Sequence, residues 1–549
     1  MEFKTIYKLQ KKALKRSAAD FTRLGFAIFF MIGVLTFTFL SNGGIPNSMF
    51  LAVAALIGAY MAMNIGANDV ANNVGPAVGS KALTLTTAII IAAIFEASGA
   101  LIAGGEVVKT IKNGIIDISA FNGNPDEFIW AMMAALLAAA LWLNFATMAK
   151  APVSTTHSIV GGVMGAGIAA AGFSVVNWTT MGSIVASWVI SPLLGGVIAA
   201  AFLFSIKKSI IFKDDKVEAA KRYVPFFVAA MSLAFVTYII LKGLKSIWPK
   251  IIEFLNLLPF ISLEITKKPA FLIAFFIGLI VAIFVYFLVK KRLSSSVTAL
   301  ENTKDSVNTL FTIPLIFAAA LLSFAHGAND VANAIGPLAA INDAVINGGV
   351  SSSASIPLWV MGVGAFGIAL GLALYGPKLI KTVGSEITDL DQIRAFSIAM
   401  SASLTVILAS QLGLPVSSTH IAIGGIFGVG FLREWLHIKD EQHRTIEEDT
   451  LIIIDEELNK NAYKHELKVL QEKSNKTQSD YTRIVDLYKL IATEKKIIKS
   501  TKKNIKKAKK VQYVRRDAIK KIIAAWLITV PVAAVLAGIL FFTIKGIMI

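Results

Sequence analysis

Apolar segments of membrane-spanning length recur along almost the whole chain, and short polar or charged stretches separate them. About thirteen such segments are centred near residues 33, 57, 95, 138, 162, 190, 233, 279, 318, 366, 402, 424 and 534. A run of roughly 20 apolar residues is long enough to cross the hydrocarbon core of a bilayer as an α-helix. The pattern therefore predicts an all-α polytopic membrane protein with about 11 to 13 apolar segments, some of them re-entrant.

The composition supports an integral membrane protein. Of the 549 residues, 55% are hydrophobic and 16% are charged, and the mean hydropathy is +0.68. An ordinary soluble core does not hide that much apolar surface. Cysteine is absent from the sequence, which excludes disulfides and thiolate metal sites. Seven of the first 23 residues are Lys or Arg, and the apolar stretch 24–41 lacks a small-residue cleavage site, so we expect a retained helix there and not a signal peptide.

One polar heptad, Gly-Ala-Asn-Asp-Val-Ala-Asn, occurs at residues 66–72 and again at 327–333, each time in apolar surroundings. A carboxylate near the bilayer midplane costs about 2.5 to 3.5 kcal/mol even on lenient insertion scales, so each aspartate predicts a compensating partner. Amide and carboxylate oxygens one helical turn apart suit a small hard cation. The candidate cation ligands, for Na⁺ or H⁺, are Asn68, Asp69, Asn72, Asn329, Asp330 and Asn333. The alternative is a packing motif of small residues with interhelical hydrogen bonds.

The distribution of basic residues orients the two heptads. Counting each apolar segment as a crossing, from an N-terminus on the inside, places the basic stretches 1–23, 206–222, 290–310 and 433–522 on one side, as the positive-inside rule requires. The segments that lead into the two heptads then run in opposite directions. The sequence therefore predicts inverted-topology repeats with broken or re-entrant helices.

A second motif, Pro-Val-Ser-x-Thr-His, follows each heptad at almost the same distance, at Pro152 to His157 and Pro415 to His420. Proline favours the first helical turn and hydroxyl side chains favour the cap, so each motif predicts a helix start whose free N–H groups attract anions. A Gly-Gly pair after each motif permits close backbone packing of a short helix. The candidate anion-binding residues are Ser154, Thr155, Thr156, Ser417, Ser418 and Thr419.

Three further titratable residues lie in apolar sequence. His157 and His420 are candidates for a proton relay, or they are neutral imidazoles that hydrogen bond to backbone or hydroxyl groups around the helix start. Glu96 lies in the apolar span from Ile89 to Ala103, and the corresponding span of the second half, around Ala365, offers it no partner. Glu96 is therefore either an additional cation or proton site or a structural hydrogen-bonding group.

These charges indicate coupled transport. The motifs hold two carboxylates and two anion-binding helix starts but no Lys or Arg. Adding an anion such as phosphate to these carboxylates in a low dielectric requires several positive charges, so cations must arrive with the anion. The sequence therefore predicts a symporter.

The paired motifs resemble those of the inorganic phosphate transporter (PiT) family of sodium- or proton-coupled phosphate symporters. The resemblance covers roughly residues 49–205 and 311–435, and the last apolar segment is also similar. It implies inverted repeats, with phosphate held at the two Ser/Thr helix starts and cations at the Asn-Asp-x-x-Asn positions. Three features depart from the family pattern: Asn73 in place of a small apolar residue, an extra N-terminal helix around residue 33, and a long polar insert.

The resemblance and the hydropathy divide the chain into six parts: residues 1–48, a basic segment and an extra transmembrane helix; 49–205, the first repeat; 206–310, connecting helices and loops; 311–435, the second repeat; 436–520, a cytoplasmic charged helical insert; and 521–549, a C-terminal transmembrane helix.

The insert has an acidic beginning and a strongly basic end. Between Lys489 and Lys521 there are fourteen Lys or Arg residues and two acidic ones, a bias that favours an anionic membrane surface. Isoleucines recur every seven residues and predict a narrow apolar stripe on a helix: Ile484, Ile491, Ile498 and Ile505. A solvated helical hairpin, a membrane-surface helix and an oligomer contact all fit this pattern.

We expect a multi-pass protein of the cell (inner) membrane, with the N-terminus and the insert in the cytoplasm. The expected partners are phosphate, Na⁺ or H⁺, membrane lipids and, as a homodimer, a second copy; a cofactor and nucleic acid are not expected. Alternative functions are a channel, a carrier of sulfate, arsenate or a metal-phosphate complex, and an intramembrane phosphoesterase. We favour a carrier over an enzyme because both halves repeat the key residues, which suits a site on a pseudo-twofold axis.

Overall fold

The computed structural model describes residues 3–121, 124–149, 153–245, 248–257, 264, 266, 268–296, 300–348, 356–386, 390–508 and 516–549. These residues are nearly all helical, with one isolated antiparallel bridge between Ile116 and Val176. Contacts divide the chain into two units, which comprise residues 1–429 with 516–549, and residues 430–515. The all-α class predicted from the hydropathy is confirmed.

Within the described residues, eleven helices are long and apolar enough to cross a membrane. They coincide with eleven of the thirteen predicted apolar segments. The remaining two segments, near residues 162 and 424, lie in α7 (Thr155–Ala171) and at the beginning of α16 (Ser418–Glu472). Both of these helices begin at a Ser/Thr motif.

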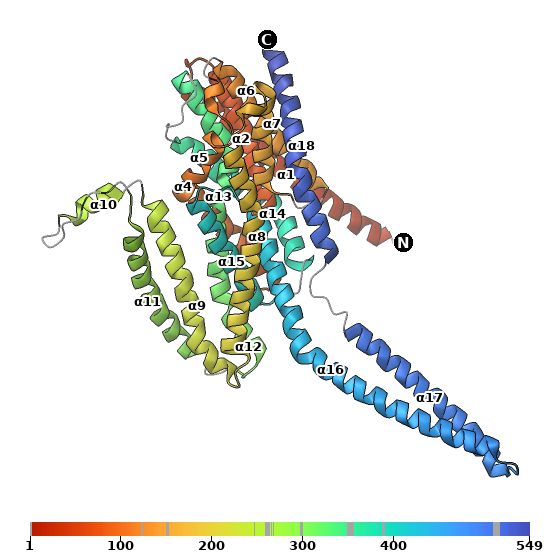
Figure 1. Cartoon of the computed structure of the whole chain (residues 1–549). Helices are drawn as coiled ribbons and strands as arrows, with labels where there is room; N and C mark the ends of the chain where they lie inside the picture. Colours follow the sequence, from red (N-terminus) through yellow and green to blue (C-terminus); the bar gives the residue numbers. More distant parts are fainter. Residues whose placement is uncertain are drawn as a thin grey trace. The chain divides into compact units, whose positions relative to one another are not determined.

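The first repeat contains α2 (Ser48–Asn68), α3 (Val70–Gly79), α4 (Leu85–Ala103), α5 (Gly105–Asn113), α6 (Pro125–Met148), α7 and α8 (Trp178–Ile206). The second contains α13 (Thr312–Asn347), α14 (Leu358–Glu386), α15 (Gln392–Gln411) and the start of α16, and α18 (Arg516–Met548) takes the position of α8. In Figure 1 these helices form one bundle, which α1 (Phe3–Ser41) also touches through α2.

Backbone crossings at glycine show that the two repeats are related by a pseudo-twofold axis. In α2, Gly66 packs directly on the carbonyl oxygen of Ile368 in α14, and Gly371 of α14 packs on Met63. The mirrored crossing joins α13 to α4, because Gly327 packs on the carbonyl oxygen of Glu96 and Gly99 packs on Phe324. In each crossing a helix of one repeat therefore packs against a helix of the other, as expected for inverted repeats packed through small residues.

The helices that follow the Ser/Thr motifs repeat this arrangement. Gly161 of α7 meets the carbonyl oxygen of Val530 in α18, and Gly424 of α16 meets that of Pro192 in α8. A side chain at any of these glycines overlaps the neighbouring backbone. The Gly-Gly pairs thus permit the close approach that the sequence predicts.

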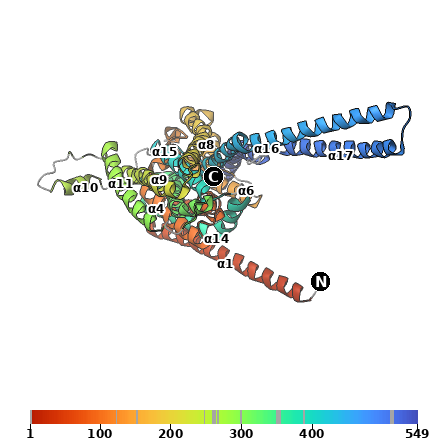
Figure 2. The ribbon, with the colours of Figure 1, turned by 90° about the horizontal axis from the view of Figure 1, so that it is seen from below.

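The connecting part of the chain adds α9 (Lys216–Tyr238), α10 (Trp248–Leu255), α11 (Phe271–Ser296) and α12 (Lys304–Leu310). Figures 1 and 2 show α9 and α11 as a packed pair. Two short π-helices, Lys207–Ile211 and Ile239–Gly243, continue α8 and α9.

The second unit is a hairpin formed by the distal part of α16 and by α17 (Gln478–Ala508). Leu467, Leu487 and Ile491 form its buried core. The heptad-spaced isoleucines face α16, because Ile491 and Ile498 are buried and Ile484 and Ile505 are half-buried. At the turn, Thr477 caps α17 by accepting from the Asp480 amide, and the Asp480 carboxylate accepts from the Thr477 amide.

Gly371→Ala tests the helix crossing at Met63. The added Cβ overlaps the Met63 backbone, and overpacking of this kind costs roughly 1–3 kcal/mol, so the purified protein should melt at a lower temperature. Gly362→Ala in the same helix is the control, because a Cβ there meets nothing within 4 Å. Fluorescence-detected size exclusion after heating measures both variants, and equal melting of the two contradicts the crossing.

Glu494→Gln tests the hairpin. Glu494 lies on the buried inner face, where its contact with Glu456 raises its pKa. The stability due to this carboxyl is present below the ordinary glutamate pKa of 4.5 and is lost as the pH rises through the raised value. The amide should therefore slow tryptic cleavage of the hairpin at pH 7.5 by about twofold to fivefold. The exposed control Glu448→Gln should leave the cleavage rate unchanged, and faster cleavage of Glu494→Gln contradicts the prediction.

Candidate functional site

The first heptad lies where α2 passes into α3. Asp69 is the residue between the two helices, and its amide still donates to the Ile65 carbonyl oxygen. Its side chain is 2% exposed and lies in the interior of the bundle. The backbone of Asp69 stays helical, at φ −85° and ψ −35°, so the heptad presents a buried carboxylate within the membrane-spanning stretch Ser48–Gly79.

The second heptad lies inside α13, which is continuous over 36 residues. Asp330 and Asn333 are both buried. Asn329 holds the irregular segment 414–417 before α16, because its amide donates to the Ser410 hydroxyl and the Leu414 carbonyl oxygen and its oxygen accepts from the Val416 amide. Asn329 thereby fixes the second Ser/Thr motif against α13.

Both Ser/Thr motifs begin a helix, as the sequence predicts; Pro152 itself lies outside the described residues. Ser154 caps α7 by accepting from the His157 amide at 3.2 Å, and Ser417 caps α16 by accepting from the His420 amide at 3.3 Å. A helix's first N–H groups have no intrahelical acceptor. In α7 these are the amides of Thr155 and Thr156, since the next two bond to Ser154.

The threonines join the two halves at the aspartates. Thr155 donates to Asp69 at 2.6 Å, and Thr419, from the opposite repeat, is 3.4 Å from the other oxygen of Asp69. The amide of Asn72 donates to Thr419 at 2.8 Å. The mirrored contact from Ser418 to Asp330 is longer, at 3.5 Å.

Asn333 completes this arrangement. Its amide donates to the hydroxyl oxygens of Thr155 at 3.2 Å and Thr156 at 3.1 Å. Each heptad thus contacts a Ser/Thr motif of the opposite repeat. The whole site is one cluster shared by both halves.

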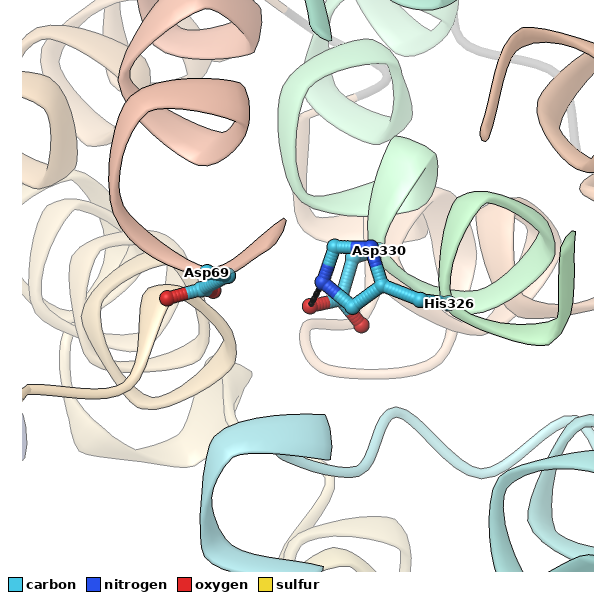
Figure 3. Close-up of side chains that lie close together, drawn as sticks. All are labelled: Asp69, His326 and Asp330. Atoms are coloured by element: carbon cyan, nitrogen blue, oxygen red, sulfur yellow. Dashed lines mark ion pairs between the residues drawn. The ribbon is translucent and has the colours of Figure 1, made fainter. Parts of the chain in front are cut away.

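Asp69 and Asp330 face each other across the centre of this cluster (Figure 3). One ligand atom from each, together with one from His326, lies within 4.8 Å of the others. Two unit charges at that separation repel by about 3 kcal/mol at an effective dielectric constant of about 20. A cation between the carboxylates removes this repulsion, and carboxylate and amide oxygens offer it ligands.

A hydrogen-bonded network extends the Asp330 side of the site. His326 Nε2 lies 3.0 Å from Asp330, and Nδ1 lies 2.7 Å from Glu96. The second oxygen of Glu96 accepts from Asn73 at 2.7 Å. All of these side chains are buried. An imidazole bonds to two carboxyl groups in this way only as an imidazolium, or when one carboxyl carries the proton.

This network belongs to one half only. In the mirrored helix crossings, Ile368 occupies the position that corresponds to Glu96. Ile65, four residues before Asp69, likewise corresponds to His326, four residues before Asp330. Asn73 likewise corresponds to Ala334. Three residues without a mirror image are thus joined in a single chain of hydrogen bonds. The two aspartates consequently have chemically different surroundings.

The two motif histidines lie on the pseudo-twofold axis and touch each other, with ring centroids 4.6 Å apart. His157 packs on Trp188 at 3.8 Å, and His420 stacks on Trp526 at 3.6 Å. Neither ring hydrogen bonds to a hydroxyl group of the described residues. Aromatic stacking therefore holds these rings, which differs from the hydrogen bonding to the helix start that the sequence suggests.

The structure joins predicted residues of both heptads, both Ser/Thr motifs and Glu96 in one buried region, whereas Asn68 is buried with its amide nitrogen unpaired among the described residues. Sequence reasoning missed His326, although it lies one helical turn before Asp330 and therefore on the same face of α13. Its absence from the repeated motif concealed it. Asn73, identified only as a departure, is the residue that binds Glu96.

Comparisons with known proteins identify the family of the chain. The sequence model described as "Phosphate transporter family" matches residues 65–537. The chain belongs to the phosphate transporter family. A Helicobacter pylori protein named "Putative phosphate permease" is 49% identical, with 98% of both chains covered. A Haemophilus influenzae protein of the same name is 38% identical over 70% of this chain and 89% of the relative.

A solved structure, "The sodium-dependent phosphate transporter", shares the fold. Its TM-score is 0.68 at 30% identity, and the match covers 91% of this chain and 99% of that one. The resemblance stated from the two motifs is thereby confirmed. The protein is a multi-pass membrane transporter of the phosphate family, with the two motifs of each repeat at its centre.

His326→Ile tests the one-sided network of this phosphate transporter family member. The single change leaves Glu96 buried with Asn73 but without its histidine partner, and breaking a buried pair of this kind destabilises by about 3 to 5 kcal/mol. Combining it with Glu96→Ile and Asn73→Ala reproduces the residues of the mirrored half and should restore most of the stability. Melting of purified protein measures the cycle. Additive losses in the triple variant rule out a coupled network.

Proposed function

We propose that the protein is a secondary active symporter that imports inorganic phosphate together with Na⁺ or H⁺ by alternating access. The observation that supports this proposal is that hydroxyl groups of residues at the two helix starts donate hydrogen bonds to an aspartate. Thr155 and Thr419 donate to Asp69 while lying in the first turns of α7 and α16. These are the places where a cation and an anion would each be held.

Phosphate is assigned to the two helix starts. Free N–H groups and the positive end of each helix favour an anion, and hydroxyl groups add donors of fixed direction. The helix starts come from opposite repeats but meet at Asp69, which accepts from Thr155 of one and Thr419 of the other. We therefore assign phosphate to both together: Ser154, Thr155, Thr156, Ser417, Ser418 and Thr419.

Cations are assigned to the heptads. Carboxylate and amide oxygens are the ligands that Na⁺ prefers, and the facing aspartates need positive charge between them. The ligands are Asn68, Asp69, Asn72, Asn329, Asp330 and Asn333. Glu96 supports the Asp330 side through His326. The transported ions are the only small molecules this scheme requires, and it involves no cofactor or chemical conversion.

The shared hydroxyl groups supply a coupling mechanism. A hydroxyl has one hydrogen, so Thr155 cannot donate to Asp69 and to phosphate at once. A cation on Asp69 neutralises the carboxylate and frees that hydrogen for the anion. Cation binding therefore precedes phosphate binding and raises the affinity for phosphate. By thermodynamic linkage, bound phosphate raises the affinity for the cation by the same factor.

The sodium-dependent phosphate transporter of similar fold favours Na⁺ as the coupling ion. The pseudo-twofold arrangement favours alternating access over a channel, since mirrored halves can exchange conformations. Other tetrahedral oxyanions, sulfate and arsenate, or a metal-phosphate complex are the alternative cargo because the same donors fit them.

The positive-inside rule supports a location in the inner membrane with the 436–520 insert on the cytoplasmic side. A homodimer is the proposed assembly, with 49–205 and 311–435 as the two repeats.

Transport by proteoliposomes tests the proposal. An inward Na⁺ gradient should drive uptake of radiolabelled phosphate above equilibrium, and Asp69→Asn or Asp330→Asn should lower it at least a hundredfold while the protein still inserts. The exposed Asp117→Asn is the control. Absence of accumulation with either a Na⁺ or a H⁺ gradient would falsify symport.

Phosphate binding tests the shared hydroxyl. Purified protein should bind radiolabelled phosphate at least tenfold more tightly with saturating Na⁺ than with choline, from a coupling of about 1 to 3 kcal/mol. Thr155→Val removes the hydrogen but keeps the shape, so it should weaken both phosphate affinity and its Na⁺ dependence. Equal affinity with Na⁺ and choline in the unmodified protein contradicts the mechanism.

A further inference from the structure

A cavity of about 660 Å³ lies between α8, α9 and α11, away from the transport site. Ligand pockets are typically about 300 to 1,000 Å³, so its size suits a bound molecule. Every lining residue belongs to an apolar membrane-spanning helix. Val197 is 67% exposed and Phe226 is 60% exposed, so the cavity is open at the side that faces the bilayer.

The lining changes character along the membrane normal. Val197, Ile198 and Ala201 of α8 and Phe226, Phe227 and Ala230 of α9 form its apolar part. Ser205, Ser209, Arg222, Tyr223 and Tyr286 form its polar part. Ser205 and Ser209 lie at the end of α8 and in the π-helix that continues it, Arg222 and Tyr223 lie in the second turn of α9, and Tyr286 lies just past the middle of α11. Arg222 directly precedes the apolar run of α9 and so marks the membrane boundary on this side. The apolar part of the cavity therefore lies toward the bilayer interior and the polar part toward the membrane boundary, as in a phospholipid of that leaflet.

Arg222 supplies a positive charge at this boundary. Its guanidinium lies 5.7 Å from the ring of Tyr223, and no carboxylate of the described residues pairs with it. The nearby carboxylates are engaged, because Glu218 bonds to Lys221 and Asp215 caps α9. A guanidinium is suited to a phosphate group, to which it donates two parallel hydrogen bonds.

We propose that this cavity binds an anionic phospholipid from the leaflet that carries the basic loops. Its acyl chains lie along the apolar part, and its headgroup phosphate bonds to Arg222. Lipid is the occupant because the cavity opens into the hydrocarbon region and ends in a cation at the depth of the headgroups. The helix α8, which lines the cavity, also packs through Gly195 and Gly196 on α16, the helix that begins at the second Ser/Thr motif.

Native mass spectrometry of the delipidated full chain tests this site with phosphatidylglycerol and phosphatidylcholine as probes. Phosphatidylglycerol should form a one-to-one adduct that phosphatidylcholine does not displace. Arg222→Gln should lower its affinity about tenfold by removing a charge-assisted hydrogen bond. Ala201→Trp, which fills the apolar part, should lower it as much.

Lys291→Gln in α11 is the matched control, because it removes a basic residue of the same loop side that does not line the cavity. Three results each overturn the proposal: equal retention of the two lipids, equal loss in Lys291→Gln and Arg222→Gln, or unchanged lipid binding in both cavity variants. Loss of a dimer in Ala201→Trp with unchanged lipid adducts would assign the cavity to a second copy of the chain instead.

Discussion

Repulsion between two buried carboxylates is the constraint around which this protein is organised. Oxygen atoms of Asp69 and Asp330 lie within 4.8 Å of each other in the protein interior, where the dielectric constant is low. Neither side chain is stable there as a carboxylate without hydrogen-bond donors and cations. The structure surrounds them with hydroxyl and amide groups from both repeats. The helix starts, the glycine crossings and the shared threonines all serve to bring these groups to one point.

Much of this organisation could be read from the sequence because repetition made it visible. Hydropathy located the spanning helices, and two copies of each motif in opposite orientation predicted the inverted repeats. The residues that only one half possesses were harder to interpret. Glu96 and Asn73 were noticed as exceptions, but their hydrogen bond to each other and the bond from Glu96 to His326, which lies 230 residues away, were not predicted. A single sequence contains no signal for such a contact between distant helices.

The histidine pair shows a different limit. Its position beside the helix starts was predictable, but its environment depends on Trp188 and Trp526, which come from helices further along each half. Stacking on these rings and on each other replaces the hydrogen bonds that a histidine in apolar sequence usually seeks. The one-sided Glu96 network and the symmetric histidine pair therefore give the same residue type two distinct environments within one bundle.

The glycine crossings have a mechanical consequence. At Gly66 and Gly371 the backbones of α2 and α14 touch directly, and α13 touches α4 in the same way. Interlocked backbones cannot slide past one another without steric overlap, so each pair behaves as a single rigid body. Because each pair takes one helix from each repeat, the interlocked pairs are hybrids of the two repeats. The boundary between these pairs thus differs from the boundary left by the duplication.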